Sequence, residues 1–122
     1  MYIHFILYFL RTIKDGLHGT ISEIKTQYIT IAGTVVLSCQ YEKLPTLRWR
    51  KRELIISQDS TMNPYFNGSE RFRATIKPKD KQYELQILNT TEEDLGLYVC
   101  EAQLDSTIIE TKVILSLAGK II

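Results

Sequence analysis

Polar and apolar residues alternate along much of this chain, which is the pattern of strands with one buried face. In residues 34–41, TVVLSCQY, one set of alternate positions is apolar or cysteine, and the other set is mostly polar. The same period of two indicates strands around residues 47–52, 53–57, 71–76, 82–88, 97–103 and 112–117. Residues 58–70, rich in Asn, Ser, Gly and Pro, predict a loop with room for a short edge strand. The pattern therefore predicts a single all-β domain.

The alternation also divides each strand's side chains between a core face and an outer face. Trp49 falls on the core face together with Leu47. Their neighbours Arg48, Arg50 and Arg52 then fall on the outer face. The other predicted core residues are Val35, Leu37, Cys39, Tyr41, Phe72, Ala74, Ile76, Tyr83, Leu85 and Ile87.

The most specific motif is residues 94–100, DLGLYVC, which ends on the second of the two cysteines. Gly96 permits a tight bend before the strand, and Asp94 is a short acceptor suited to a turn or to a cation. The lone tryptophan, Trp49, follows the first cysteine, Cys39, by ten positions. One of these features alone would be weak evidence, but together and at these spacings they form a specific pattern.

This pattern resembles the immunoglobulin superfamily, and within it the variable (V) type, over about residues 23–118. The resemblance implies an immunoglobulin-like two-sheet Greek-key sandwich with a disulfide between Cys39 and Cys100. It also implies that Trp49 packs on this bridge. Tyr98 would form the tyrosine corner, in which a buried phenol is hydrogen-bonded to the backbone upstream.

Further features agree with the V type, and one departs from it. Arg71 at a strand start and Asp94 at the following corner occupy the positions of an ion pair common in V-type domains. Residues 53–70 are long enough for extra edge strands, and residues 26–31 take the place of the first edge strand. The F-G-x-G bulge of antibody and T-cell-receptor joining segments is missing from residues 110–115, which argues against a rearranged antigen receptor.

Composition argues against several classes of function. The formal net charge of +1 gives no global field for nucleic acid or an anionic membrane. Two cysteines without a C-x-x-C or a Cys/His cluster argue against zinc. The only histidines are His4 and His18, so processing of the N-terminus would remove Ser-His, Cys-His and His-metal chemistry. We therefore expect no enzyme, no cofactor and no metal.

Residues 1–19 begin with an apolar run, YIHFILYFL, that is too short to span a bilayer and long enough for the core of a secretory signal. No Lys or Arg precedes it, so a buried first strand or a wrongly assigned start are the alternatives. Cleavage near Thr20 would leave residues 20–122 as one V-type domain without a transmembrane segment. Sequons at Asn67 and Asn89 support an extracellular chain, as does the cysteine pair.

Arg48, Arg50 and Arg52 are the first candidate binding residues, together with Glu101 on the neighbouring strand. The resemblance implies that they lie on the sheet face made of strands G, F, C and C′, the GFCC′ face, which V-type domains commonly use for recognition. Arginine forks suit the carboxylates of a partner. The alternative is a solvated strand whose charges pair with Glu101 and Glu53.

Residues 104–109 are the second candidate, as the predicted loop between the last two strands. Beside Leu104, the apolar pair Ile108 and Ile109 would be exposed at the loop tip, and exposed apolar surface often marks a partner site. The alternative is that the two isoleucines begin the last strand and one packs inward.

These observations favour a non-enzymatic extracellular recognition domain, of the kind found in immune receptors and adhesion proteins. It would bind a protein ligand or receptor on a cell surface through the GFCC′ face, and nucleic acid is not an expected partner. The alternatives are a homophilic adhesion or assembly domain and a soluble decoy of an immune receptor, such as some viruses encode. The chain would be secreted, or be the ectodomain of a truncated surface receptor.

Overall fold

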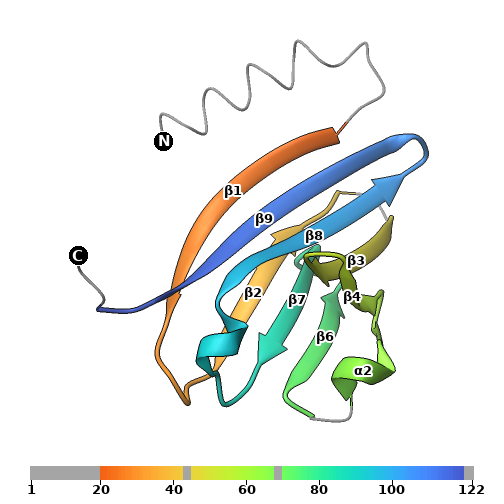
Figure 1. Cartoon of the computed structure of the whole chain (residues 1–122). Helices are drawn as coiled ribbons and strands as arrows, with labels where there is room; N and C mark the ends of the chain where they lie inside the picture. The colour runs from red at the N-terminus through yellow and green to blue at the C-terminus, as the bar shows by residue number, and fades with distance from the viewer. Residues whose placement is uncertain (1–19, 43–44, 68–69, 120–122) are drawn as a thin grey trace.

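The computed structural model describes residues 20–42, 45–67 and 70–119 of the chain (Figure 1). The expected signal segment, residues 1–19, lies outside the described residues and stays a prediction. The elements are β1 (Thr20–Ile29), β2 (Val35–Gln40), β3 (Thr46–Lys51), β4 (Leu54–Gln58), β5 (Thr61–Met62), α2 (Pro64–Asn67), β6 (Phe72–Lys77), β7 (Gln82–Ile87), the 3-10 helix η2 (Glu92–Asp94), β8 (Gly96–Leu104) and β9 (Thr107–Leu117).

The strands of the described residues form two sheets packed face to face. The larger sheet has the order β1-β9-β8-β3-β4-β5, and the smaller has the order β2-β7-β6. Pairing is antiparallel except between β1 and β9, which run parallel along the whole of β1 (Figure 1). The predicted two-sheet sandwich is confirmed, and the short edge strand expected between residues 58 and 70 is β5.

Burial confirms the predicted core face. The alternate residues of β2, β3 and β7 that were expected inward are all buried, because the two sheets enclose them. Phe72 and Ile76 of β6 are partly buried and pack against the edge of this cluster. The fully inaccessible side chains of the predicted set are Leu37, Leu47, Trp49, Tyr83, Leu85 and Ile87.

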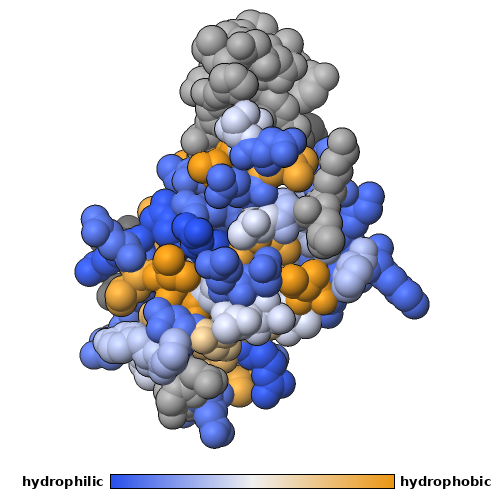
Figure 2. All heavy atoms as spheres, turned by 90° about the vertical axis from the view of Figure 1, so that its right-hand side faces the viewer, coloured by the Kyte–Doolittle hydropathy of each residue, from blue (hydrophilic) through white to orange (hydrophobic). Residues whose placement is uncertain are grey.

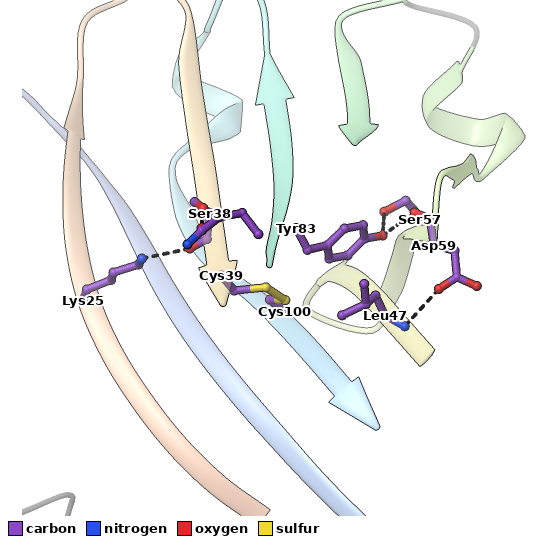
Figure 3. Close-up of a disulfide and its surroundings, with 9 residues drawn as sticks. Lys25, Ser38, Cys39, Leu47, Ser57, Asp59, Tyr83 and Cys100 are labelled. Carbon is purple, nitrogen blue, oxygen red and sulfur yellow. Dashed lines mark hydrogen bonds between the residues drawn. A yellow bond between two sulfur atoms is a disulfide. The ribbon is translucent and has the colours of Figure 1, made fainter. Parts of the chain in front are cut away.

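A disulfide joins the two sheets at the centre of the core (Figure 3). Cys39 of β2 and Cys100 of β8 are bonded, with their Cα atoms 6.5 Å apart, as predicted. Trp49 is the cross-strand neighbour of Cys100, and Tyr83 is that of Cys39. The rings of Trp49 and Tyr83 stack with centroids 5.9 Å apart, so the tryptophan lies beside the bridge as expected.

The Tyr83 hydroxyl satisfies its hydrogen bonds at the rim of the core. It donates to the carbonyl oxygen of Asp59 at 2.6 Å and lies 2.8 Å from the hydroxyl of Ser57 (Figure 3). Burial raises the pKa of Tyr83 to about 12, although the bond to Ser57 acts in the other direction. The phenol therefore stays neutral at physiological pH.

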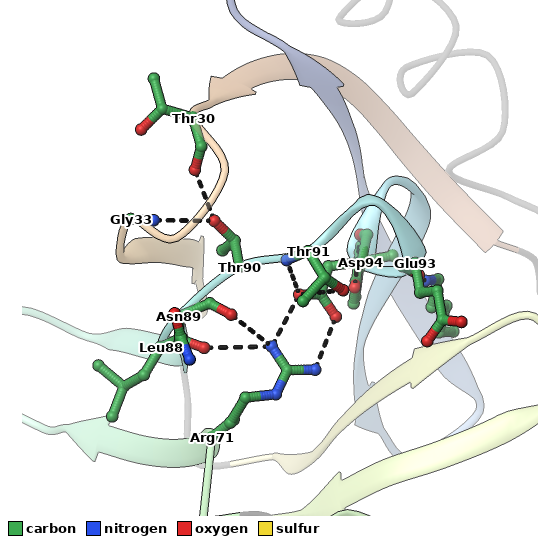
Figure 4. A network of polar contacts seen from close by, with 11 residues as sticks. Thr30, Gly33, Arg71, Leu88, Asn89, Thr90, Thr91, Glu93 and Asp94 are labelled. Atoms are coloured by element: carbon green, nitrogen blue, oxygen red, sulfur yellow. Dashed lines mark hydrogen bonds and ion pairs between the residues drawn. The ribbon is translucent and has the colours of Figure 1, made fainter.

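An ion pair holds the corner between β7 and β8, at the centre of the network in Figure 4. Arg71 donates from both terminal nitrogens to the Asp94 carboxylate, at 2.8 and 3.1 Å, and also to the carbonyl oxygens of Leu88 and Asn89. Asp94 accepts a further bond from the backbone N–H of Thr91 at 2.8 Å. The expected pair of Arg71 and Asp94 is therefore present and is bidentate.

Burial and hydrogen bonding set the ionisation of this corner. Burial alone would raise the pKa of Asp94, but the bonds from Arg71 and Thr91 and the nearby positive charge outweigh it, so the pKa lies below its ordinary value. Tyr98 donates to the carbonyl oxygen of Asp94 at 2.7 Å, which is the expected tyrosine corner. Gly96, between them, has φ 123°, a left-handed conformation that glycine adopts easily.

Strand β1 is longer than the predicted edge strand at residues 26–31 and pairs only with β9. Ile29 at its end is buried in the core, whereas the inward Lys25 and Gln27 reach the neighbouring edge of β2. Lys25 Nζ donates to the carbonyl oxygen of Ser38 at 2.8 Å, and Gln27 Nε2 donates to that of Val36 at 3.1 Å. Side-chain donors therefore occupy carbonyls that a paired strand would otherwise bind.

Candidate functional site

The outer face of the six-stranded sheet points away from the smaller sheet, and its strands β9, β8, β3 and β4 form the predicted GFCC′ face. Register places Arg48 of β3 opposite Glu101 of β8, and Glu101 opposite Glu110 of β9. Arg50 lies in the next row, opposite Val99. The two arginines are therefore on the outer face, where alternation from Trp49 had put them.

Both arginines are paired with carboxylates. Arg50 Nε donates to Glu101 at 2.9 Å, and a terminal nitrogen of Arg50 lies 3.6 Å from Glu110. Arg48 approaches Glu101 less closely, at 3.5 Å. The alternative of pairing across the strands is thus confirmed for Glu101, while Glu110 takes the place expected for Glu53. Arg50 is held by two carboxylates, and Arg48 is the more available of the two cations.

Arg52 is not on this face, contrary to the prediction. Strand β3 ends at Lys51, and Arg52 lies in the turn to β4 with φ 56°. The alternation that placed it outward therefore stops one residue before it. Its side chain lines the cleft at the base of the sandwich described below.

The predicted loop at residues 104–109 is wrong. Strand β8 runs to Leu104 and β9 begins at Thr107, so the turn between them is only two residues long. Ile109 packs against the core, as in the alternative considered for it. Ile108 faces outward and lines a small hollow of about 130 Å³ with Arg48, Glu101 and two polar neighbours, Thr46 and Gln103.

An exposed apolar group on the outer face was not predicted. Leu97 of β8 and Ile114 of β9 are exposed large hydrophobic residues directly opposite one another. Ile24 and Tyr28 of β1 are exposed as well, on the next strand. The signal was present in the sequence, since Leu97 and Ile114 are apolar residues out of phase with the buried Tyr98 and with the buried Val113 and Leu115.

A cleft of about 850 Å³ lies at the base of the sandwich, between the β3–β4 turn, α2 and the corner at η2. The Lys51 ammonium donates to the carbonyl oxygen of Glu93 at 2.6 Å and lies 5.1 Å from the centre of the Tyr98 ring. Burial lowers the pKa of Lys51. Two of the cleft's cations, Lys51 and Arg71, are engaged within the fold, whereas the third, Arg52, is exposed in the turn.

Apolar surface also occurs elsewhere on the molecule. The side of the molecule on the right of Figure 1 faces the viewer in Figure 2, where apolar surface is divided into several patches among hydrophilic ones. The outer-face group differs from such scattered residues because register places its members side by side on three adjacent strands.

Among residues 20–42, 45–67 and 70–119, no three His, Cys, Asp or Glu side chains gather as a possible metal site. No helix among the described residues is long and apolar enough to span a membrane. Asn89 is exposed at the corner before β8, whereas the Asn67 sequon extends into residues outside those described.

The outer face offers a partner ion pairs, through Arg48, Arg50 and their carboxylates, and apolar contact.

Sequence comparison identifies a family. The family model of the immunoglobulin V-set domain matches residues 30–116, which is most of the chain. No sequence among curated proteins matches the chain.

Solved structures share the fold at low sequence identity. The second immunoglobulin domain of the mouse polymeric immunoglobulin receptor is 19% identical with a TM-score of 0.63, covering 82% of this chain and 99% of that one. A chain of the complex of Dpr2 Ig1-Ig2 with DIP-Theta Ig1–Ig3 is 18% identical with a TM-score of 0.66, covering 78% and 32%. A chain of the ZIG-8–RIG-5 IG1-IG1 heterodimer is 14% identical with a TM-score of 0.64, covering 80% and 83%.

Proposed function

Because the chain belongs to the immunoglobulin V-set family, we propose that it is a non-enzymatic extracellular recognition domain. It binds a protein ligand through the outer face of its six-stranded sheet. The observation that carries this proposal is the composition of that face, where exposed apolar side chains on β8 and β9 share one surface with arginines on β3. Arginine and large apolar groups are the residues on which protein interfaces depend most.

The opposite face of the molecule is less suited to a partner. The exposed outward residues of the smaller sheet are mainly polar, for example Gln40, Arg73 and Thr75, with Val36 as an apolar exception. Two of the similar structures are complexes between immunoglobulin-domain proteins, Dpr2 with DIP-Theta and ZIG-8 with RIG-5. These relatives support a protein as the class of ligand.

Binding to a panel of purified extracellular immunoglobulin-domain proteins tests this function. The variants Arg48→Glu and Ile108→Asp change the hollow on the outer face and leave Arg50 with its two carboxylates. Each is expected to weaken binding at least about tenfold, roughly 1.4 kcal/mol. Salt should slow association of the parent, because the partly exposed Arg48 contributes mainly to the rate of encounter.

Arg73→Glu is the matched control, since it reverses one exposed arginine on the smaller sheet. Circular dichroism confirms that each variant is folded. If Arg73→Glu weakens binding and both outer-face variants bind like the parent, the recognition surface lies on the other sheet. A parent that binds no member of the panel counts against a protein ligand of this class.

The extracellular location predicts processing that can be measured directly. Material secreted from animal cells should begin near Gly19 or Thr20 and carry a glycan at Asn89, which is exposed at the corner. N-terminal sequencing and mass spectrometry before and after glycosidase treatment report both features. Secreted protein that retains Met1, or an Asn89 that is never modified, would contradict the corresponding part of the proposal.

A further inference from the structure

Four exposed apolar side chains of the outer face gather around Ile114, away from the hollow beside Arg48; a fifth, Ile55 of β4, lies apart from them, opposite Arg50. Ile114 lies directly opposite Leu97 on one side and Thr26 on the other. Ile24 and Tyr28 flank Thr26 on β1 and so lie diagonally from Ile114, within reach of a shared partner. The exposed fractions are 39% for Ile114, 41% for Leu97, 56% for Ile24 and 66% for Tyr28. We call these four residues the apolar patch.

The apolar patch does not contribute to the core. On β8 and β9 the patch residues stand beside inward, buried side chains such as Tyr98 and Val113, and on β1 the inward Lys25 and Gln27 bind β2. Val99, which faces outward opposite Arg50, is buried as well and is not part of the patch. Polar residues would serve equally well on a face in contact with water. Adjacent exposed apolar residues on neighbouring strands are typical of a surface that a partner covers.

The charges around the apolar patch decide which partner fits. Lys112 lies opposite Ile24 in the register and has only a distant contact with Glu110, at 4.0 Å. The face's carboxylates, Glu101 and Glu110, are both engaged by Arg50. Among the described strand residues of this sheet, the outward charged side chains are the cations Arg48, Arg50 and Lys112 and the carboxylates Glu101 and Glu110, which gives a net charge of 3 − 2 = +1. This face therefore favours a partner surface that carries negative charge.

A second copy of the chain is a poor occupant for this reason. In a two-fold dimer the patch of one copy packs against the same patch of the other. The positively charged face of one copy, with Lys112 beside the patch, would then approach the equally positive face of the other. Like charges brought together across an interface are unfavourable. A different protein with carboxylates beside its apolar side chains meets both requirements.

We propose that Ile24, Tyr28, Leu97 and Ile114 anchor the partner and that Lys112 selects one with an acidic rim. The occupant is the surface of another protein, with apolar side chains flanked by Asp or Glu. This inference rests on the proposed function and adds which part of the outer face provides most of the affinity. Arg50, already held by two carboxylates, then contributes less than the patch.

A small probe tests the chemistry of the patch before any partner is known. The probe is 4-phenylbutyrate, an apolar group with one carboxylate, and its control is the cation 4-phenylbutylamine. Titration of the isotope-labelled domain is followed by NMR. We expect the largest shifts at Leu97, Ile114 and Lys112, and binding of the amine about threefold weaker or more. Shifts that are absent from the patch, or equal for the two probes, would overturn the proposal.

The variant Ile114→Ser tests the anchor, and Val36→Ser on the smaller sheet is its control. The two parent side chains have nearly equal exposure, 39% and 38%. Ile114→Ser should weaken phenylbutyrate binding at least about fivefold, and Val36→Ser less than about twofold. Equal effects of the two variants would show that the probe recognises apolar surface in general, which contradicts the proposal.

Affinities of the variants for the protein partner found in the panel distinguish this inference from the proposed function. A loss of at least tenfold in Ile114→Ser, larger than in Arg48→Glu, supports both. If Arg48→Glu loses affinity and Ile114→Ser binds like the parent, the proposed function stands and the proposal that the patch anchors the partner is overturned. Sedimentation of the parent alone should give a monomer, and a dimer that Ile114→Ser abolishes would replace the heterologous partner by a second copy.

Discussion

Replacing Cys39 and Cys100 together by alanine is expected to lower the free energy of unfolding by about 4 kcal/mol. The bridge spans a sequence separation of 61 residues, and a cross-link of this length removes much of the conformational freedom of the unfolded chain. Both sulfurs are also in the core, where Trp49 and Tyr83 lie beside them. Urea unfolding of the parent and the double variant measures the difference.

A reducing agent provides the control for this prediction. It should lower the stability of the parent towards that of the double variant and leave the double variant unchanged. A double variant within about 1 kcal/mol of the parent would show that the bridge contributes little to the fold, contrary to the entropic argument.

The variant Asp94→Asn is expected to lower the free energy of unfolding by about 3 kcal/mol. The change removes the negative partner of Arg71 at a corner where the Asp94 side chain is 5% exposed and its carboxylate also accepts the N–H of Thr91. Breaking a buried pair leaves a charge without compensation, which is costlier than losing a surface pair. The control is Glu84→Gln, which breaks the more exposed pair with Lys77 and should cost less than about 1 kcal/mol. Equal losses in the two variants would contradict a structural role for the corner.

The same pair predicts how stability depends on pH. The pKa of Asp94 is lower in the folded protein than its ordinary value of about 3.9. The ionised carboxylate therefore makes its full contribution to the stability of the fold above the ordinary pKa. It is lost as pH falls through the folded pKa. The stability gap between the parent and Asp94→Asn should therefore narrow below about pH 4. A gap that stays constant down to pH 2 would mean that Arg71 does not depend on the ionised carboxylate.

The sequence predicted the core and the corner because each depends on a strict local pattern. Alternation fixes which side chains of β2, β3 and β7 point inward, and burial agrees. The motif from Asp94 to Cys100 carries its geometry in side chains that bond the nearby backbone, as Tyr98 does. Such short-range constraints can be deduced without knowing the neighbours.

The edge strand β1 and the hairpin formed by β8 and β9 could not be predicted in the same way. On β1 the inward Lys25 and Gln27 are polar because they bind the edge of β2, and only Ile29 at the end of the strand is buried in the core, so the usual alternation is lost over most of the strand. On β9, Ile108 and Ile109 are both apolar although only Ile109 faces the core, so the strand gives no period of two. Glu110 was missed for the same reason, since its place beside Arg50 depends on the register of this strand.

A glycan placed on each face in turn tests the central claim, that recognition uses the outer face of the six-stranded sheet. Ile114→Asn creates a sequon with Ser116 on that face, and Arg73→Asn creates one with Thr75 on the outer face of the smaller sheet. Both are made in secretory cells, and mass spectrometry confirms that the new sites carry glycan. Binding to the panel partner should fall about a hundredfold or more with the glycan at position 114 and stay within about threefold with the glycan at position 73. Retained binding at position 114 together with loss at position 73 would contradict the account and move the site to the other sheet.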